Sequence, residues 1–176
     1  MNQVIQHYVT KWQKTAGTMD PPPPRKITIP VCYDEEFGLD IERVMTHTSL
    51  TAEEIIQRHT KPLYTVYMMG FLPGFPYLGQ LDETLATPRL ATPRRSVAKG
   101  SVGIGGNQTG IYPLESPGGW NMIGKTPIEL FSIDRSEPFF LQAGDSLQFV
   151  PIKKSEFYKI KQALAAKPEA LDEYVC

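Results

Sequence analysis

The spacing of hydrophobic and polar positions predicts many short strands through the middle of the chain. Residues 26–33 (KITIPVCY) alternate apolar and polar side chains, and residues 63–69 form an apolar, β-rich run that ends at Gly70. Six further strands, separated by turn residues, are expected at residues 101–105, 109–112, 120–123, 128–133, 139–141 and 146–150. This spacing predicts a mainly β domain, built either as a closed barrel or as a sandwich.

Helical periodicity is limited to segments near the ends of the strand-rich region. Apolar residues at helical spacing predict helices at residues 2–15, 39–47, 52–59 and 155–166. Thr51, followed by Glu53 and Glu54, is a favourable N-terminus for the third of these. We therefore expect a few short helices to flank the strands.

The first predicted helix is set apart from the rest by a run of four prolines at residues 21–24. Consecutive prolines form a stiff, extended spacer. A helix tethered in this way cannot bury its apolar face alone, so we expect residues 2–15 to belong to something that docks on the domain or is missing from it.

Glycine and proline are concentrated where the strands are predicted. Eleven of the 14 glycines fall between Gly70 and Gly124, and eight of the 16 prolines lie between Pro62 and Pro127. Long helices are excluded there, because proline lacks a backbone donor and glycine loses the most entropy in a helix. Aromatic and β-branched residues also run through this block, which argues against disorder. We interpret it as an ordered, turn-rich β region.

The overall charge narrows the classes of partner. The chain has 18 Lys and Arg against 19 Asp and Glu, a net charge of −1, which argues against a general nucleic-acid binder. No apolar run approaches the roughly 18–20 residues that cross a bilayer, and the first residues lack the features of a signal peptide. Neither the cysteines nor the three scattered histidines have metal-ligand spacing. A cytoplasmic protein without metal, membrane or nucleic-acid contacts is expected.

Two repeats place arginines on stiffened backbone in a stretch without acidic residues. Thr-Pro-Arg occurs at residues 87–89 and again at residues 92–94, and no Asp or Glu lies between residues 84 and 114. Arg89 and Arg94 are therefore candidates for binding a carboxylate or phosphate. Equally, they could pair with Asp82, Glu83 or Glu115 in a structural network.

Other candidate features nearby also allow two interpretations. The glycine-rich segment at residues 100–110 could present bare amides to an anion, or it could be two strands joined by a tight turn. The aromatic residues of the block could line a pocket, although core packing explains most of them; they are Phe71, Phe75, Tyr77, Tyr112 and Trp120. His59 closes a predicted helix, where capping is its simplest role.

A formal match to a phosphate-binding loop, Gly119-x-x-x-x-Gly124-Lys125-Thr126, has the wrong context. Such a loop opens a long helix whose N-terminus holds the phosphate. Here Pro127 and a short apolar run follow, and Trp120 lies where bare backbone is needed. We do not expect ATP to bind at this motif.

Three long motifs together resemble one protein family. They are GFLPGFPYLGQLD at residues 70–82, TPRLATPRRSV at residues 87–97 and GSVGIGGNQTGIYPLESPGGWNMIGKTP at residues 100–127. They resemble the KipI and allophanate hydrolase subunit 1 family, which includes the PxpB-like component of bacterial ATP-dependent 5-oxoprolinase, over about residues 27–152. One position departs from the family pattern: Lys99 stands where the family has a small residue.

The resemblance implies a cyclophilin-like closed β-barrel with a few short flanking helices. It implies the barrel domain at residues 26–152, a C-terminal helix and tail at residues 153–176, and a residual helix and proline-rich linker at residues 1–25. That linker would follow an N-terminal α/β domain which full members of the family carry and which this chain lacks.

Two functions follow from the resemblance. In the first, the chain works with a KipA-like subunit and a LamB/YcsF-like subunit to open the lactam of 5-oxoproline to glutamate. The complex would use ATP, and this chain alone would bind no cofactor. His59 and Arg94 would be catalytic. Substrate would contact residues from the aromatic and glycine-rich segments: Phe75, Tyr77, Arg89, Gly106, Gln108, Tyr112 and Trp120. In the second, the barrel binds the helical dimerisation domain of a sensor histidine kinase and inhibits it.

Overall fold

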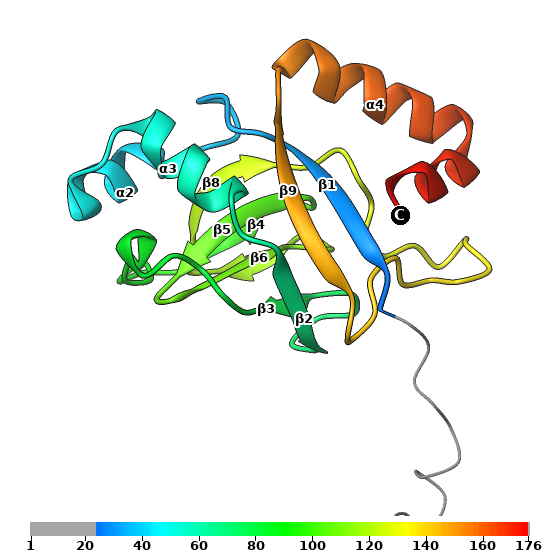
Figure 1. Ribbon diagram of the computed structural model, residues 1–176, viewed down its shortest axis with the longest axis horizontal. Coiled ribbons are helices and arrows are strands. Elements are labelled where there is room, and N and C mark those ends of the chain that lie inside the picture. Colours follow the sequence, from blue (N-terminus) through cyan, green and yellow to red (C-terminus); the bar gives the residue numbers. More distant parts are fainter. Residues whose placement is uncertain (1–23, 176) are drawn as a thin grey trace, which may run out of the picture.

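The computed structural model describes residues 24–175, whose strands close into a seven-stranded barrel (Figure 1). Around the barrel the strands follow the order β1 (Lys26–Cys32), β8 (Asn121–Lys125), β5 (Ser101–Gly105), β6 (Gln108–Ile111), β3 (Pro76–Leu78), β2 (Tyr64–Met69) and β9 (Ser146–Ile152). The mainly β prediction is confirmed, and of the two architectures it is the closed barrel that forms. The helix predicted at residues 2–15 lies outside the described residues, as does most of the proline run.

The barrel closes by parallel pairing of its first and last strands. β1 and β9 pair along their whole length, from Lys26 beside Ser146 to Cys32 beside Ile152, whereas the other neighbouring strands are antiparallel. The guanidinium of Arg25 fastens the start of this pair: its Nε and Nη2 donate to the two carboxylate oxygens of Asp145, at 3.0 and 2.6 Å. The ends of the barrel sequence are therefore held together at one seam.

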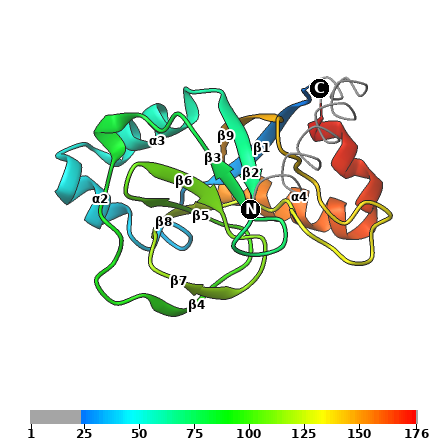
Figure 2. The same cartoon turned by 90° about the horizontal axis from the view of Figure 1, so that it is seen from below.

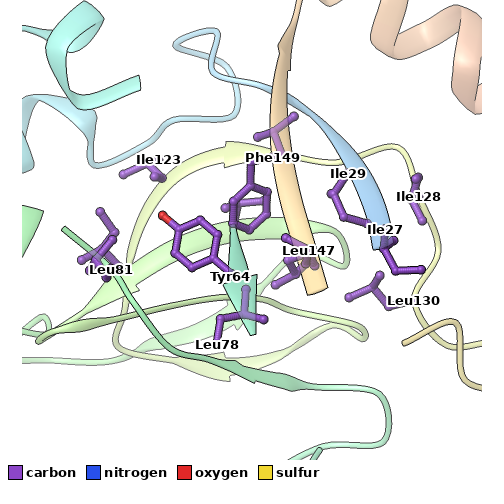
Figure 3. Packing of buried hydrophobic residues seen from close by; sticks show 14 of the residues in the cluster. Ile27, Ile29, Tyr64, Leu78, Leu81, Ile123, Ile128, Leu130, Leu147 and Phe149 are labelled. Atoms are coloured by element: carbon purple, nitrogen blue, oxygen red, sulfur yellow. The ribbon is translucent and has the colours of Figure 1, made fainter. Parts of the chain in front are cut away.

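The barrel interior is filled by alternate residues of its strands, as the hydrophobic spacing predicted (Figure 3). In β1 these are Ile27, Ile29 and Val31, all fully buried; in β9 they are Leu147 and Phe149. Each such side chain contributes roughly 1.5–3 kcal/mol by leaving water. Because the period is two, the same spacing sets which residues of each strand face outward.

In the described part of the chain, three helices flank the barrel, close to the predicted bounds: α2 (Ile41–Thr48), α3 (Ala52–Thr60) and α4 (Lys154–Ala166). α2 contacts β8, α3 contacts β9, and α4 lies beside β1 (Figure 1). A short 3₁₀ segment, η2 (Pro168–Tyr174), packs against α4. Within residues 24–175, none of the helices has the length and apolar character that crossing a membrane would require.

Replacing Thr51 with alanine is expected to lower the free energy of unfolding by about 1 kcal/mol. Thr51 caps α3: its Oγ1 accepts from the amide of Glu54, and the Glu54 carboxylate accepts from the amide of Thr51 at 2.9 Å. The substitution removes the Oγ1 atom, which accepts from the Glu54 amide and donates to the Glu54 carboxylate at 2.8 Å, while the backbone amide of residue 51 is kept. Urea unfolding of the two proteins measures the loss, and the same midpoint for both would contradict the expected role.

Two predicted strands do not form. Residues 128–133 and 139–141 touch through a single bridge between Phe131 and Phe139 and otherwise run as an irregular loop. Two backbone bonds flank this bridge, from the Ser132 amide to the Pro138 carbonyl oxygen and from the Phe140 amide to the Leu130 carbonyl oxygen. The guanidinium of Arg135 also donates to the carbonyl oxygens of Glu129 and Pro138, at 2.8 and 3.0 Å. The formal phosphate-loop match covers β8, which is a strand within the barrel wall.

A small second sheet, absent from the prediction, lies outside the barrel. It pairs β4 (Arg94–Val97) with β7 (Ser116–Gly118). Figure 2 shows this pair as a separate layer below the barrel strands, away from α4. The β4 sequence, RRSV, is polar and short, so hydrophobic spacing does not reveal it.

Candidate functional site

A cluster of aromatic side chains fills the space between the barrel wall and the β4–β7 sheet. Its buried members are Phe75, Val97, Tyr112, Trp120 and Met122, with Leu72 and Tyr77 packed against them. Phe75 lies at its centre, with ring centroids 5.5 Å from Tyr77, 5.5 Å from Tyr112 and 5.6 Å from Trp120. The structure thus brings together the four aromatic residues predicted to contact substrate.

The aromatic cluster packs against the backbone of glycines in β5 and β6. Val102 and Ile104 of β5 point into the barrel core, so the residues that alternate with them, Gly103 and Gly105, face outward. A Cβ atom at Gly105 would lie 2.5 Å from Nε1 of Trp120. The absence of side chains lets the indole lie directly on the backbone of the barrel wall. Packing against Met122 at Gly103 and against Trp120 at Gly105 accounts for these glycines without an anion.

Replacing Gly105 with alanine is expected to destabilise the protein by about 1–3 kcal/mol, because the added methyl group must displace the ring of Trp120. Chemical denaturation measures the cost. The matched control is Gly119→Ala, since a Cβ there meets its nearest neighbours at ordinary contact distances of 3.6–3.7 Å. An equal effect of the two substitutions would show that backbone flexibility, rather than contact with the indole, sets the requirement for glycine.

Arg89 lies at the edge of the aromatic cluster with its guanidinium over Trp120, 5.7 Å from the ring centroid. Burial raises the pKa of the Tyr112 hydroxyl, and the positive charges of Arg89 and Arg94 lower it by less. Tyr112 is therefore a neutral hydrogen-bonding group at ordinary pH. Its ring packs closely against Gly118 of β7, which ties the second sheet to the cluster. The Arg89 guanidinium, the buried Tyr112 hydroxyl and the Trp120 indole thus lie close to one another.

The guanidinium of Arg94 forms a structural ion pair. Its Nη1 and Nη2 donate to the two carboxylate oxygens of Asp40, at 2.9 and 2.7 Å, and Asp40 also accepts from the amide of Met122 at 2.7 Å. Asp40 is almost fully buried. The structural interpretation weighed for the arginines therefore describes Arg94, although its partner is none of the acidic residues considered. Asp40 was not predicted because it is 54 residues away in the sequence.

His59 lies in the barrel interior, apart from the aromatic cluster, and is fully buried. Its Nδ1 is 2.7 Å from the hydroxyl of Tyr33, its Nε2 is 2.8 Å from Oγ1 of Thr109, and its ring stacks on Phe149. Burial lowers the pKa of the imidazole to about 3, so it is neutral at ordinary pH. General acid or base catalysis by His59 remains a prediction, and these surroundings support a structural role.

The glycine-rich segment forms the strand–turn–strand arrangement, with Gly105 opposite Gln108 across a two-residue turn. Gly106 has a φ of +67°, which favours glycine. Its amide donates to the carbonyl oxygen of Thr87 at 2.8 Å, so that amide already has an acceptor. Gln108 is half-buried at the start of β6. Lys99 lies elsewhere, in an ion pair with Glu129.

Across residues 24–175, no group of three or more histidine, cysteine or acidic side chains is arranged to hold a metal ion. The aromatic cluster itself combines the Arg89 cation, the Tyr112 hydroxyl and the apolar rings of Phe75 and Trp120.

Comparison with known families identifies the chain. The model of a family described as the carboxyltransferase domain, subdomains C and D, matches residues 2–141. The chain belongs to this family. The resemblance inferred from the sequence motifs is confirmed, since the similar proteins include several named as the B subunit of 5-oxoprolinase.

Two relatives and one solved structure illustrate the similarity. The chain is 49% identical over 138 residues to the 5-oxoprolinase B subunit of Bacillus subtilis, covering 78% of this chain and 58% of the relative. It is 56% identical over 126 residues to the protein of that name from Haemophilus influenzae, covering 72% of this chain and 59% of the relative. The crystal structure of a conserved uncharacterised protein from Pyrococcus horikoshii has 47% identity and a TM-score of 0.72, covering 85% of this chain and 66% of that one. The chain thus spans about three fifths of the two curated relatives.

Proposed function

We propose that this chain forms the barrel part of the B subunit of an ATP-dependent 5-oxoprolinase, which opens the lactam of 5-oxoproline to give glutamate. The observation that carries the proposal is the 47–56% identity to proteins named as that subunit. In the proposal the chain works with a KipA-like and a LamB/YcsF-like subunit in the cytoplasm, where ATP is available. ATP is used by the complex and is not held by this chain alone.

The chemistry of lactam opening explains what the barrel contributes. A lactam is a poor electrophile, so the proposed route begins with transfer of the γ-phosphoryl group of ATP to its oxygen, which releases ADP. Water then attacks the ring carbon, phosphate leaves, and the C–N bond breaks to give glutamate. Charge that develops on oxygen is stabilised by donors held in place before the reaction. In the proposal, Arg89 holds the carboxylate of 5-oxoproline at the edge of the aromatic cluster, and the partly buried ring of Tyr77, which packs on Phe75, faces the lactam ring. The turn with Gly106 and Gln108 borders the same site.

Arg94 acts in the proposal as a positioning residue. Because its guanidinium is held by the Asp40 carboxylate, it fixes β4 to the segment before α2. This contact holds the second sheet over the aromatic cluster, where Gly118 meets Tyr112. Removing Arg94 is therefore expected to reduce activity through loss of structure.

The test is co-expression of the full-length protein with its two proposed partner subunits and measurement of ATP-dependent glutamate release. Arg89→Gln is expected to lower kcat/KM by about ten- to a hundredfold, the usual effect of losing a hydrogen bond to a charged group. Arg95→Gln is the control, because Arg95 is an exposed arginine on the same segment. Absence of ATP-dependent turnover in the wild-type complex would contradict the function, and equal activity of both variants would contradict the site.

The second function, binding of a sensor histidine kinase, is supported by exposed apolar side chains at the end of β2 and in the loop after it. Tyr67, Met68 and Phe71 are 65%, 55% and 67% exposed. Exposed aromatic and methionine side chains suit docking of an amphipathic helix. Titration of the chain into a sensor histidine kinase is expected to lower the rate of kinase autophosphorylation. Met68→Asp is expected to weaken this inhibition. Ile133→Asp, at an 82% exposed position of another loop, is the control and is expected to leave the inhibition unchanged. An unchanged rate with the wild-type chain would count against this function.

A further inference from the structure

A cavity of about 400 Å³ lies on the α4 side of the barrel, apart from the aromatic cluster. It is an open pocket bordered by α4, η2 and the irregular loop after β8, and none of its lining residues belongs to the aromatic cluster. Three cationic side chains line it: Lys99, Arg135 and Lys161. Two acidic ones, Glu129 and Asp134, and an apolar surface with Leu164 and Leu171 complete the lining.

The lining of this cavity carries more positively charged than negatively charged side chains. Lys99 is paired with Glu129. Arg135 donates to the carbonyl oxygens of Glu129 and Pro138, which are neutral acceptors, and its Nε is buried without an acceptor within the described chain. Among the ion pairs of residues 24–175, neither Arg135 nor Lys161 has a carboxylate partner.

A neighbouring lysine shows the same crowding of positive charge. Lys125, at the end of β8, has its pKa lowered first by burial and then by the charge of Lys161. Lys125 does not line the cavity, but its repulsion by Lys161 shows that Lys161 lies in positive surroundings, which an anion bound beside Lys161 would offset. Lys99 lines this cavity and no part of the aromatic cluster.

The apolar part of the lining determines which anion fits. Leu171 is buried, and Leu164 packs against the barrel core, so both are fixed in place. Fully hydrated inorganic ions gain nothing from such a surface, whereas a short aliphatic chain does. A cavity of this size accommodates a small molecule.

We propose that the cavity between α4, η2 and the loop after β8 binds a small organic anion with one or two carboxylates on a short aliphatic body. The carboxylates lie against Lys161, Arg135 and Lys99, and the aliphatic body lies against Leu164 and Leu171. This site is separate from the aromatic cluster and does not depend on the 5-oxoprolinase function.

The test is titration of the full chain with glutarate, a dicarboxylate with three methylene groups, followed by amide chemical shifts. Saturable binding is expected with a Kd on the order of 1 mM and with shift changes at Leu164 and Leu171. Lys161→Gln is expected to weaken binding roughly tenfold, as loss of one charged contact does. Lys159→Gln, which removes a lysine of the same helix that does not line the cavity, is expected to bind as the wild type does.

The variant Lys99→Gln and the anion sulfate provide two further tests. Lys99→Gln frees the Glu129 carboxylate, so it is expected to weaken binding at least as much as Lys161→Gln. Both lysines are exposed, so both variants should keep the wild-type unfolding temperature. Lack of saturation at about 20 mM glutarate, or shift changes confined to other parts of the protein, would overturn the proposal. Sulfate binding as tightly as glutarate would also overturn it, because the apolar surface would then play no part.

Discussion

Lowering the pH from about 7 to 4 is expected to destabilise this protein steeply, and replacing His59 with glutamine is expected to remove much of that dependence. The imidazole is fully buried and bonded at both nitrogens, and burial lowers its pKa to about 3. In the unfolded chain the pKa returns to about 6.5. Between these two values the unfolded chain binds a proton that the folded protein does not.

The direction and size of the effect follow from that difference. The contribution of neutral His59 to stability is complete above about pH 6.5 and is lost as the pH falls toward about 3. Over this range the slope approaches about 1.4 kcal/mol for each pH unit. At neutral pH, His59→Gln itself is expected to cost about 1–3 kcal/mol, because it leaves a buried hydroxyl of Tyr33 or Thr109 without its partner.

Urea unfolding of both proteins across this pH range measures the two effects together. Carboxylates that titrate in the same range act equally in wild type and variant, so the difference between the curves isolates His59. His47→Gln is the control, because His47 is exposed on α2. Parallel curves for the wild type and His59→Gln would show that the imidazole titrates normally in the folded protein.

Replacing Arg94 with methionine is expected to cost about 3 kcal/mol of folding free energy. Methionine keeps much of the side-chain length but leaves the buried carboxylate of Asp40 without its cation. The loss is expected to be larger than for an ordinary surface ion pair, because a buried unpaired charge carries its full cost of desolvation.

A double-mutant cycle separates the pair from other effects of the substitution. Asp40→Asn retains an oxygen that accepts from the Met122 amide but carries no charge. The double variant is expected to be less destabilised than the sum of the two single variants, by at least about 1 kcal/mol. Arg95→Met, at the exposed neighbouring position, is expected to stay within about 0.5 kcal/mol of wild type. Additive effects in the cycle would mean that the two groups do not stabilise each other.

The parts of the fold that depend on local spacing were predictable from sequence. β1, β5 and the three helices appear close to their predicted bounds, because each has a regular apolar period over its whole length. The loop at residues 126–145 was wrongly predicted to hold two strands. Its apolar side chains have the composition of strands, but the strand pairing is limited to one bridge, and the guanidinium of Arg135 bonds the carbonyl oxygens of Glu129 and Pro138. Hydrophobic spacing alone does not show which group will satisfy a backbone acceptor.

The residue types of the candidate site were predictable from the sequence, but their arrangement in space was not. Phe75, Tyr112 and Trp120 do come together, yet they are 2–6% exposed and form a packed cluster more than an open pocket. Arg94 is bound to a residue from a distant segment, a pairing that only the folded chain creates. Long-range contacts of this kind leave no periodic trace in the sequence.

The parallel seam between β1 and β9 has a consequence for synthesis of the protein. Arg25 and Asp145, which meet at the start of the seam, are 120 residues apart in the chain. While the ribosome makes the intervening strands, β1 has no parallel neighbour and β2 has an unpaired edge, because both pair with β9. The sheet can close only after β9 emerges, so a nascent chain stalled before residue 146 presents open strand edges that invite aggregation.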